Sequence, residues 1–241
     1  MMKITFLGTG TSTGNPEIGC TCEVCTSKDP RDWRLRASAF VEIDGKHLLI
    51  DCGPDFRLQM LTHSITRLDG VLVTHEHYDH VGGLDDLRPF CRDKGVDIYA
   101  EDNVAEAIIT RMPYAFREFK YPGVPNLELI RISEQPFDAA GIKVIPIRIL
   151  HGKLPILGYR IGNFAYLTDL KYISDDEINL VAWILSDGSL RKGIRGTSYA
   201  IYQSKEDNIY LILDSYYIQK LTRKKIAGNL RISLRTVDDY L

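Results

Sequence analysis

Three histidines and an aspartate lie within the six-residue run His75-Glu76-His77-Tyr78-Asp79-His80. The run follows residues 70–73, a short apolar segment typical of a buried strand. Imidazole and carboxylate groups suit zinc, iron or manganese, and a turn after a strand can direct such side chains to two neighbouring points. The run therefore predicts a metal site. The alternative is a surface loop that merely happens to be rich in histidine.

Neighbouring segments fit a site of this kind. Residues 47–50 form a second apolar, strand-like segment, and it also ends in a carboxylate, Asp51. Gly82 and Gly83 follow the histidine run and allow the backbone to turn tightly and to approach the site closely. His47 and His63 match no motif, so we expect them to be surface or structural residues.

The elements that position these side chains are short strands mixed with helices. Asp44-Gly45 and Gly162-Asn163 each separate two apolar runs and predict hairpins. We expect strands at residues 3–7, 40–43, 47–50, 70–73, 97–100, 142–149, 159–161 and 165–167. We expect helices at residues 55–61, 85–92 and 104–111. This mixture indicates a layered α/β or α+β fold.

Composition narrows the class of protein. The chain has 241 residues, a net charge of -2, 44% hydrophobic and 26% charged residues, which is typical of a globular protein and excludes a disordered, collagen-like or coiled-coil chain. The longest strongly apolar run, residues 180–185, is too short to span a membrane. No signal-peptide pattern opens the sequence, so we expect a cytoplasmic protein without a membrane partner.

The composition changes near residue 179. All histidines, cysteines and prolines lie at or before residue 155, and residues 180–241 hold 10 Lys+Arg against 6 Asp+Glu. The sequence thus predicts a domain at 1–178 and a divergent basic segment at 179–241.

Several motifs in residues 2–178 resemble the metallo-β-lactamase superfamily, and within it the PhnP-like phosphodiesterase branch, with tRNase Z as a cousin. They are Gly8-Thr9-Gly10-Thr11-Ser12-Thr13-Gly14, Gly19 to Cys25, the strand ending at Asp51, His75 to His80, His151-Gly152-Lys153-Leu154, Leu157-Gly158-Tyr159 and Tyr166-Leu167-Thr168-Asp169.

The resemblance implies an αβ/βα sandwich with two catalytic metal ions, zinc or manganese, at the sheet edges. It implies that His75, His77 and His151 hold the first ion, that Asp79 and His80 hold the second, and that Asp169 bridges both. Asp79 and Asp169 would be the catalytic carboxylates. Asp51 would orient the ligands through hydrogen bonds.

Cys20, Cys22 and Cys25 have the spacing of thiolate ligands on a loop. A structural zinc needs a fourth ligand, which relatives of the PhnP type supply as a late histidine. This sequence has no histidine after His151, so three reduced thiols without metal are the alternative. Cys52 and Cys91 are expected to be buried small residues.

The last catalytic histidine of the family is missing as well. Asp214, at the end of the strand-like residues 209–213, is the only attractive substitute ligand for the second ion. The sandwich is therefore predicted to be incomplete or altered at its C-terminus.

The segment 180–241 resembles other families. Residues 180–188 and 202–205 are similar to LAGLIDADG homing endonucleases, with Asp187 as the acidic residue, but only one such acidic motif is present. Residues 221–241 resemble a helix-turn-helix, with an amphipathic helix pair as the alternative. A fused or rearranged reading frame would explain both features.

Together these features predict a metal-dependent hydrolase that cleaves small phosphodiesters or nucleotide-type substrates with a metal-activated hydroxide, at a one- or two-metal site. Lys153 could contact the substrate phosphate, and Arg34 and Arg36 are expected to be plain surface charges. The alternatives are hydrolysis of another ester, thioester, lactone or lactam, nucleic-acid binding through the C-terminal segment, or an inactive homologue. The sequence is also compatible with a homodimer.

Overall fold

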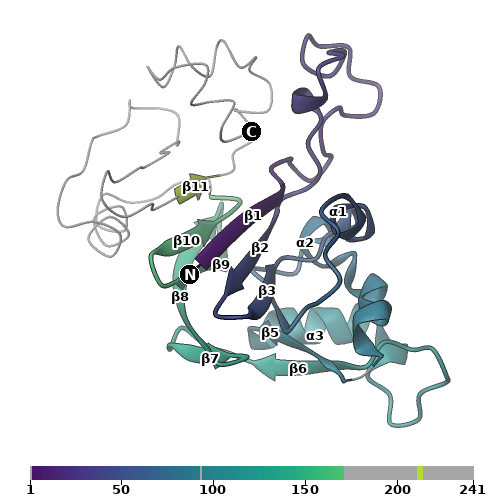
Figure 1. Cartoon of the computed structure of the whole chain (residues 1–241), viewed down its shortest axis with the longest axis vertical. Helices are drawn as coiled ribbons and strands as arrows, with labels where there is room; N and C mark the ends of the chain where they lie inside the picture. Colours follow the sequence, from purple (N-terminus) through teal and green to yellow (C-terminus); the bar gives the residue numbers. More distant parts are fainter. Residues whose placement is uncertain (1, 93, 171–210, 214–241) are drawn as a thin grey trace.

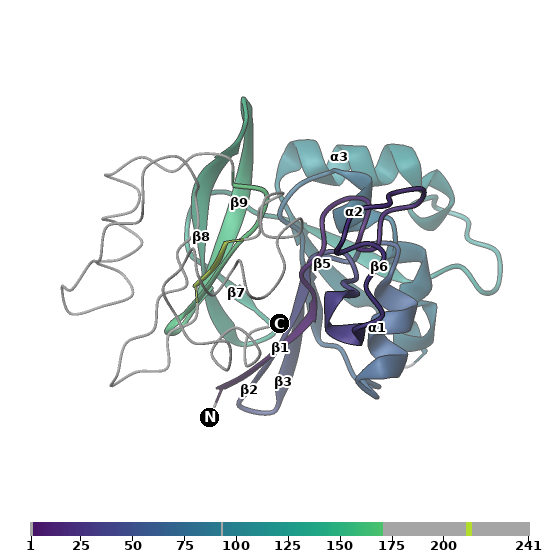
Figure 2. The same ribbon diagram turned by 90° about the horizontal axis from the view of Figure 1, so that it is seen from above.

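Two β-sheets face each other in this computed structural model, and helices cover the outer face of one of them (Figures 1 and 2). The structure describes residues 2–92, 94–170 and 211–213. The described residues form three layers, namely helices, a six-stranded sheet and a five-stranded sheet, which correspond to the helix–sheet–sheet part of the expected αβ/βα sandwich. The boundary expected at residue 178 lies outside the described residues.

The six-stranded sheet has the order β1-β2-β3-β4-β5-β6. Its strands are β1 (Met2–Gly8), β2 (Ser38–Ile43), β3 (Lys46–Ile50), β4 (Gly70–Leu72), β5 (Val96–Ala100) and β6 (Leu127–Arg131). The helical segments are η1 (Pro30–Asp32), α1 (Phe56–Thr62), α2 (Tyr78–Val81), η2 (Leu84–Cys91), α3 (Asp102–Arg111) and η3 (Pro113–Ala115).

β2 and β3 form the hairpin predicted at Asp44-Gly45, and both turn residues have the positive φ that such a turn requires. From β3 to β6 the strands run parallel. Parallel strands end at the same edge of a sheet, so the segments that follow Ile50, Leu72 and Ala100 lie along one edge.

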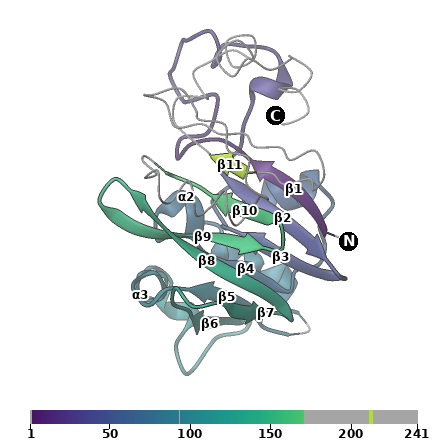
Figure 3. The ribbon, with the colours of Figure 1, turned by 90° about the vertical axis from the view of Figure 1, so that its left-hand side faces the viewer.

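The five-stranded sheet has the order β11-β10-β9-β8-β7 (Figure 3). Its strands are β7 (Phe137–Ala139), β8 (Ile142–His151), β9 (Leu154–Ile161), β10 (Phe164–Leu167) and β11 (Leu211–Leu213). β8 and β9 form a long antiparallel hairpin in which His151 pairs with Leu154. β11 runs parallel to β10, with Leu213 opposite Leu167.

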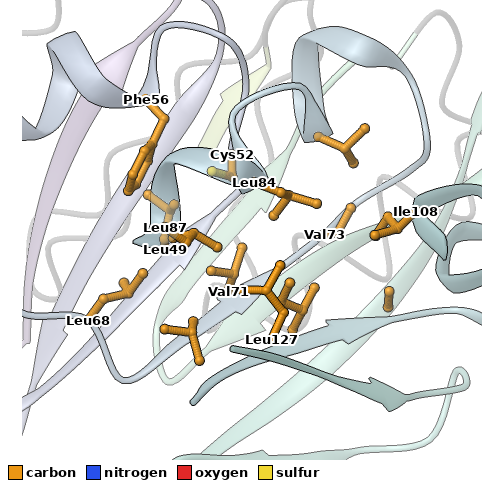
Figure 4. Close-up of a cluster of buried hydrophobic side chains, with 14 of the residues drawn as sticks. Leu49, Cys52, Phe56, Leu68, Val71, Val73, Leu84, Leu87, Ile108 and Leu127 are labelled. Carbon is orange, nitrogen blue, oxygen red and sulfur yellow. The ribbon is translucent and has the colours of Figure 1, made fainter. Parts of the chain in front are cut away.

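Two apolar cores hold the layers together. Between the helices and the first sheet, Leu49, Phe56, Val71, Leu84 and Ile108 are each at most 1% exposed (Figure 4). Between the sheets, fully buried side chains from both sheets pack together, among them Leu48, Leu72, Leu157, Tyr159 and Phe164. Removing a fully buried Leu or Ile side chain from such a core typically costs about 2–5 kcal/mol of stability. The edge that carries the predicted ligands is therefore supported from both sides.

Some elements differ from the sequence-based expectations. The helix expected at residues 85–92 is a 3₁₀ segment, η2, with Pro89 inside it; proline has no N–H to donate and disfavours an α-helical ladder. Strands β6 and β7, which are only five and three residues long, were not among the strands expected from the sequence. No helix in the described part of the chain is long and apolar enough to cross a membrane.

Candidate metal centre

The predicted ligands converge where the ends of three strands meet. His75 and His77 follow β4, His151 ends β8, and Asp169 follows β10. Their ligand atoms form two groups, in each of which all atoms lie within 4.8 Å of one another. The groups are His75, His77 and His151, and His75, His80 and Asp169. Because His75 belongs to both, the two groups are adjacent.

In the first group, Nε2 of His75 lies 3.1 Å from Nδ1 of His77. The ring of His151 lies 5.7 Å from that of His75 and 5.3 Å from that of His77. Nδ1 of His151 is buried and has no hydrogen-bond partner among the described residues. Three imidazole rings whose nitrogen atoms lie within 4.8 Å of one another suit a divalent ion.

In the second group, Nε2 of His80 lies 2.8 Å from Oδ2 of Asp169 and 3.2 Å from Oδ2 of Asp79. The same Asp169 oxygen lies 3.3 Å from Nε2 of His75. One carboxylate oxygen of Asp169 thus lies within 3.3 Å of a ring nitrogen of both His75 and His80.

Asp51 supports both ligand groups through hydrogen bonds. Its carboxylate is fully buried and accepts hydrogen bonds from Nδ1 of His80 (2.7 Å), from the N–H of Thr74 (2.8 Å) and from the hydroxyl of Thr74 (2.9 and 3.0 Å). The parallel register of β3 and β4, with Ile50 opposite Leu72, places Asp51 beside Thr74. Nδ1 of His80 therefore donates to Asp51, and Nε2 faces Asp79 and Asp169.

The hydroxyl group of Thr74 connects Asp51 to His75 through two hydrogen bonds. The Thr74 hydroxyl lies 3.0 Å from Nδ1 of His75. Since its single proton is donated to Asp51, this hydroxyl accepts from Nδ1–H of His75. Nε2 of His75 is then the ring nitrogen that faces His77 and Asp169. Both buried histidines are held in the tautomer that metal binding needs.

The charges of the second group are strongly coupled. Burial disfavours a charged His80, but Asp51, Asp169 and Asp79 outweigh burial and raise the pKa of His80 well above its ordinary value. Burial also opposes ionisation of Asp169, yet His75 and His80 hold its pKa far below the usual range. The pKa of Asp79 is likewise lowered, mainly by His80 against the effect of burial.

In the first group, burial, His75 and His151 lower the pKa of His77. A neutral imidazole is the form that binds a metal ion.

The backbone near the site is closely packed. A Cβ at Gly53 would lie 2.0 Å from the carbonyl oxygen of Asp79, and one at Gly83 would lie 2.1 Å from that of Gly53. The close approach expected at Gly83 is therefore present. Asp51 and Asp169 have φ of +61° and +54°, a region that residues other than glycine rarely adopt. Such outliers cluster at functional sites.

These observations fit a divalent metal. The donors are nitrogen and oxygen, two of the histidines are 1% exposed, and their ring orientations are fixed by hydrogen bonds. A family comparison agrees with the expected superfamily: the model of the "Beta-lactamase superfamily domain" matches residues 46–186, more than half of the chain. The chain belongs to the beta-lactamase superfamily.

The predicted PhnP-like relationship within the superfamily is also confirmed. A solved structure described as a new diphosphatase from the PhnP family is 39% identical, with a TM-score of 0.68, over 75% of this chain and 70% of that chain. Ribonuclease Z of Methanococcus maripaludis is 26% identical over 127 residues, 50% of this chain and 35% of that protein.

A third relative is named as a transferase rather than as a hydrolase. An octanoyltransferase of Porphyromonas gingivalis is 53% identical over 179 residues, 73% of this chain but only 36% of that protein. The chain thus spans about a third of the length of these two curated relatives. The name of such a relative does not by itself describe the segment it shares with this chain.

The cysteine cluster expected on the loop after β1 is brought together. The Sγ atoms of Cys20, Cys22 and Cys25 lie within 4.8 Å of one another. Cys25 receives the N–H of Glu17 (3.4 Å) and donates to Oδ1 of Asn15 (3.3 Å). Hydrogen bonds from Cys25 and Cys20 lower the pKa of Cys22 to about 7. This group is separate from the two groups of the metal centre.

Other predicted residues have different surroundings. Lys153 is exposed in the β8–β9 turn, two residues after His151. Arg36 is bound by Asp55, whose carboxylate accepts from its N–H and its guanidinium, both at 2.8 Å. Arg34 is buried, so the expectation of a surface charge is wrong for it: its backbone pairs with Asn15. Asp214 and Asp187 lie outside the described residues.

Two residues of the Leu157-Gly158-Tyr159 motif have a structural role at the site that the motif itself did not indicate. Tyr159, fully buried on β9, donates its hydroxyl proton to the carbonyl of Val73 (2.5 Å). The N–H of Leu157 donates to the carbonyl of Thr74 (3.1 Å). These bonds join the second sheet to the segment just before His75. Only the partners' positions in space reveal this role.

Proposed function

We propose that this chain is a metal-dependent phosphodiesterase with zinc or manganese as its catalytic metal. The observation that supports this most is the pair of adjacent ligand groups that share His75. Two ions bound there would supply a Lewis acid for a phosphoryl oxygen and would acidify a water molecule for attack. The 39% identity to a PhnP-family diphosphatase supports a phosphate ester over other esters.

The chain's own residues have distinct roles in this proposal. His75, His77 and His151 would hold one ion, and Asp79, His80 and Asp169 would hold the other. Asp51 and Thr74 keep the Nδ1 protons of His80 and His75 in place, so that Nε2 is the nitrogen of each ring that faces the proposed ions. Asp79 and Asp169 stay ionised at neutral pH because their pKa values are lowered.

The test compares substrate classes in protein loaded with zinc or with manganese. We expect bis(4-nitrophenyl) phosphate to be hydrolysed faster than 4-nitrophenyl phosphate, a thioester or the β-lactam nitrocefin, with loss of activity on chelation. His77→Ala is the matched variant, because His77 is exposed and its removal should leave the fold intact. It should lose most of the bound metal and the activity. Faster turnover of nitrocefin or of the thioester would refute the proposal.

A further inference from the structure

A guanidinium group lies beside the metal centre, between α3 and the histidine run. Nη1 of Arg111 donates to the carbonyl oxygen of Glu76 (3.0 Å), and the guanidinium carbon lies 6.0 Å from the centre of the Tyr78 ring. Glu76 lies between His75 and His77, and Tyr78 lies between His77 and Asp79. Both contacts of Arg111 therefore fall on residues adjacent to the proposed ligands.

Helix α3 fixes the backbone of Arg111 next to the histidine run. Arg111 is the last residue of α3, and the buried side chains Val104, Ala105 and Ile108 fix the helix on the core. At the other end, Glu101 precedes the helix and forms a two-bonded ion pair with Arg148 of β8 (2.5 and 2.8 Å). The helix thus joins the two sheets that supply the ligands.

The charge of Arg111 has no ion-pair partner among the residues that the structure describes. Arg36, Arg88, Arg131 and Arg148 each pair with a carboxylate. No carboxylate in the described part of the chain pairs with Arg111, which is exposed. Tyr78 is 59% exposed, so the ring beneath the guanidinium also faces solvent. The backbone bond uses one of the five guanidinium N–H groups and leaves others for a ligand.

We propose that Arg111 binds a second phosphoryl group of the substrate, next to the one that is cleaved. This inference rests on the proposed phosphodiesterase function and narrows its substrate class to nucleotide-type diesters that carry a further phosphate. Guanidinium is planar and presents two parallel N–H groups to a phosphate, and the hydrogen bond to the Glu76 carbonyl fixes the position of one of its nitrogens. Arg111 is then a specificity residue, because it contacts a part of the substrate that does not react.

The test uses two substrates that differ by one phosphate. They are thymidine 5′-(4-nitrophenyl phosphate) and the same compound with a 3′-phosphate. Arg111→Gln should raise KM for the 3′-phosphorylated substrate on the order of 10-fold, because a charge-assisted hydrogen bond is lost. It should leave KM for the other substrate and kcat for both nearly unchanged. Arg111→Lys, which keeps the charge but not the planar fork, should fall between.

The matched control is Arg160→Gln. Arg160 also donates to a backbone carbonyl, that of Gly162 (2.9 Å), but it lies near the end of β9 away from His151. This variant should behave like the wild type with both substrates. Equal losses with both substrates in Arg111→Gln would overturn the inference, since they would indicate a structural role.

A binding measurement separates this inference from the proposed function. By calorimetry, zinc-loaded wild-type protein should bind thymidine 3′,5′-bisphosphate more tightly than thymidine 5′-monophosphate, and Arg111→Gln should remove the difference. If the wild type hydrolyses neither substrate but shows this difference in binding, the phosphodiesterase proposal fails and the phosphate site stands. If the two nucleotides bind equally to the wild type, the phosphate site fails whatever the activity.

Discussion

Asp51 and His80 form a buried pair in which Oδ2 of the carboxylate lies 2.7 Å from Nδ1 of the imidazole, and neither side chain is more than 1% exposed. The carboxylate is shared with Thr74, which in turn holds His75. One residue at the end of β3 therefore orients one ligand of each proposed ion. The hydrogen bonds of Asp51 therefore connect the two ligand groups.

Asp51→Asn should weaken metal binding. Removal of a hydrogen-bonding partner behind a metal ligand typically lowers affinity or activity about 10–100-fold. The amide can satisfy either Thr74 or His80 but cannot accept from both as a carboxylate does. Metal content after dialysis against a graded series of chelator concentrations measures the loss. Asp69→Asn is the control, because Asp69 is also buried but binds His47, and it should retain its metal.

Metal binding should release a proton from His80. The raised pKa means that the metal-free protein holds His80 protonated at neutral pH, and only the neutral ring binds an ion. Zinc affinity should therefore rise with pH as long as the pH lies below the raised pKa of His80, and it should level off above that pKa. Calorimetry in buffers of different ionisation enthalpy counts the protons. A pH-independent affinity between pH 6.5 and 8 would contradict the proposed role of His80.

Gly53→Ala should displace helix α2, which carries Asp79. The added methyl group would lie 2.0 Å from the carbonyl oxygen of Asp79, and because this neighbour is backbone it cannot move aside easily. We expect a loss of about 1–3 kcal/mol in stability, as for overpacking in general, and weaker binding of the second ion. Thermal unfolding and metal titration check this. Gly45→Asn adds a side chain in open space at φ +76°, which asparagine tolerates, and should change little.

The cysteine group should bind one further zinc ion. Three Sγ atoms within 4.8 Å of one another supply most of a tetrahedral thiolate site, with water or another residue as the fourth ligand. Cys22→Ser should lose about one equivalent of zinc per chain while the ions at the histidine centre remain. Metal counts before and after the substitution decide this. An unchanged count would favour three reduced thiols without metal.

The sequence predicted the ligand run because its residues are adjacent in the chain and their types allow little other chemistry. It also predicted the strands at residues 47–50 and 70–73 from their apolar runs. It could not predict the role of Thr74, because the partner that gives the hydroxyl its direction, Asp51, comes from the neighbouring strand. Arg111 was missed for a similar reason: it lies 35 residues from Glu76, on a different element.

The proposed centre takes its residues from two sheets, and this affects when it can form. Asp169 follows His80 by 89 residues. At synthesis rates of 5–20 residues per second, His75, His77 and His80 leave the ribosome roughly 5–20 s before Asp169 does. During that interval the growing chain presents a partial set of imidazoles, which discriminates poorly between divalent cations. The metal found in purified protein should therefore depend on which ions were abundant in the growth medium, and exchange after folding is needed to reveal the preference of the finished site.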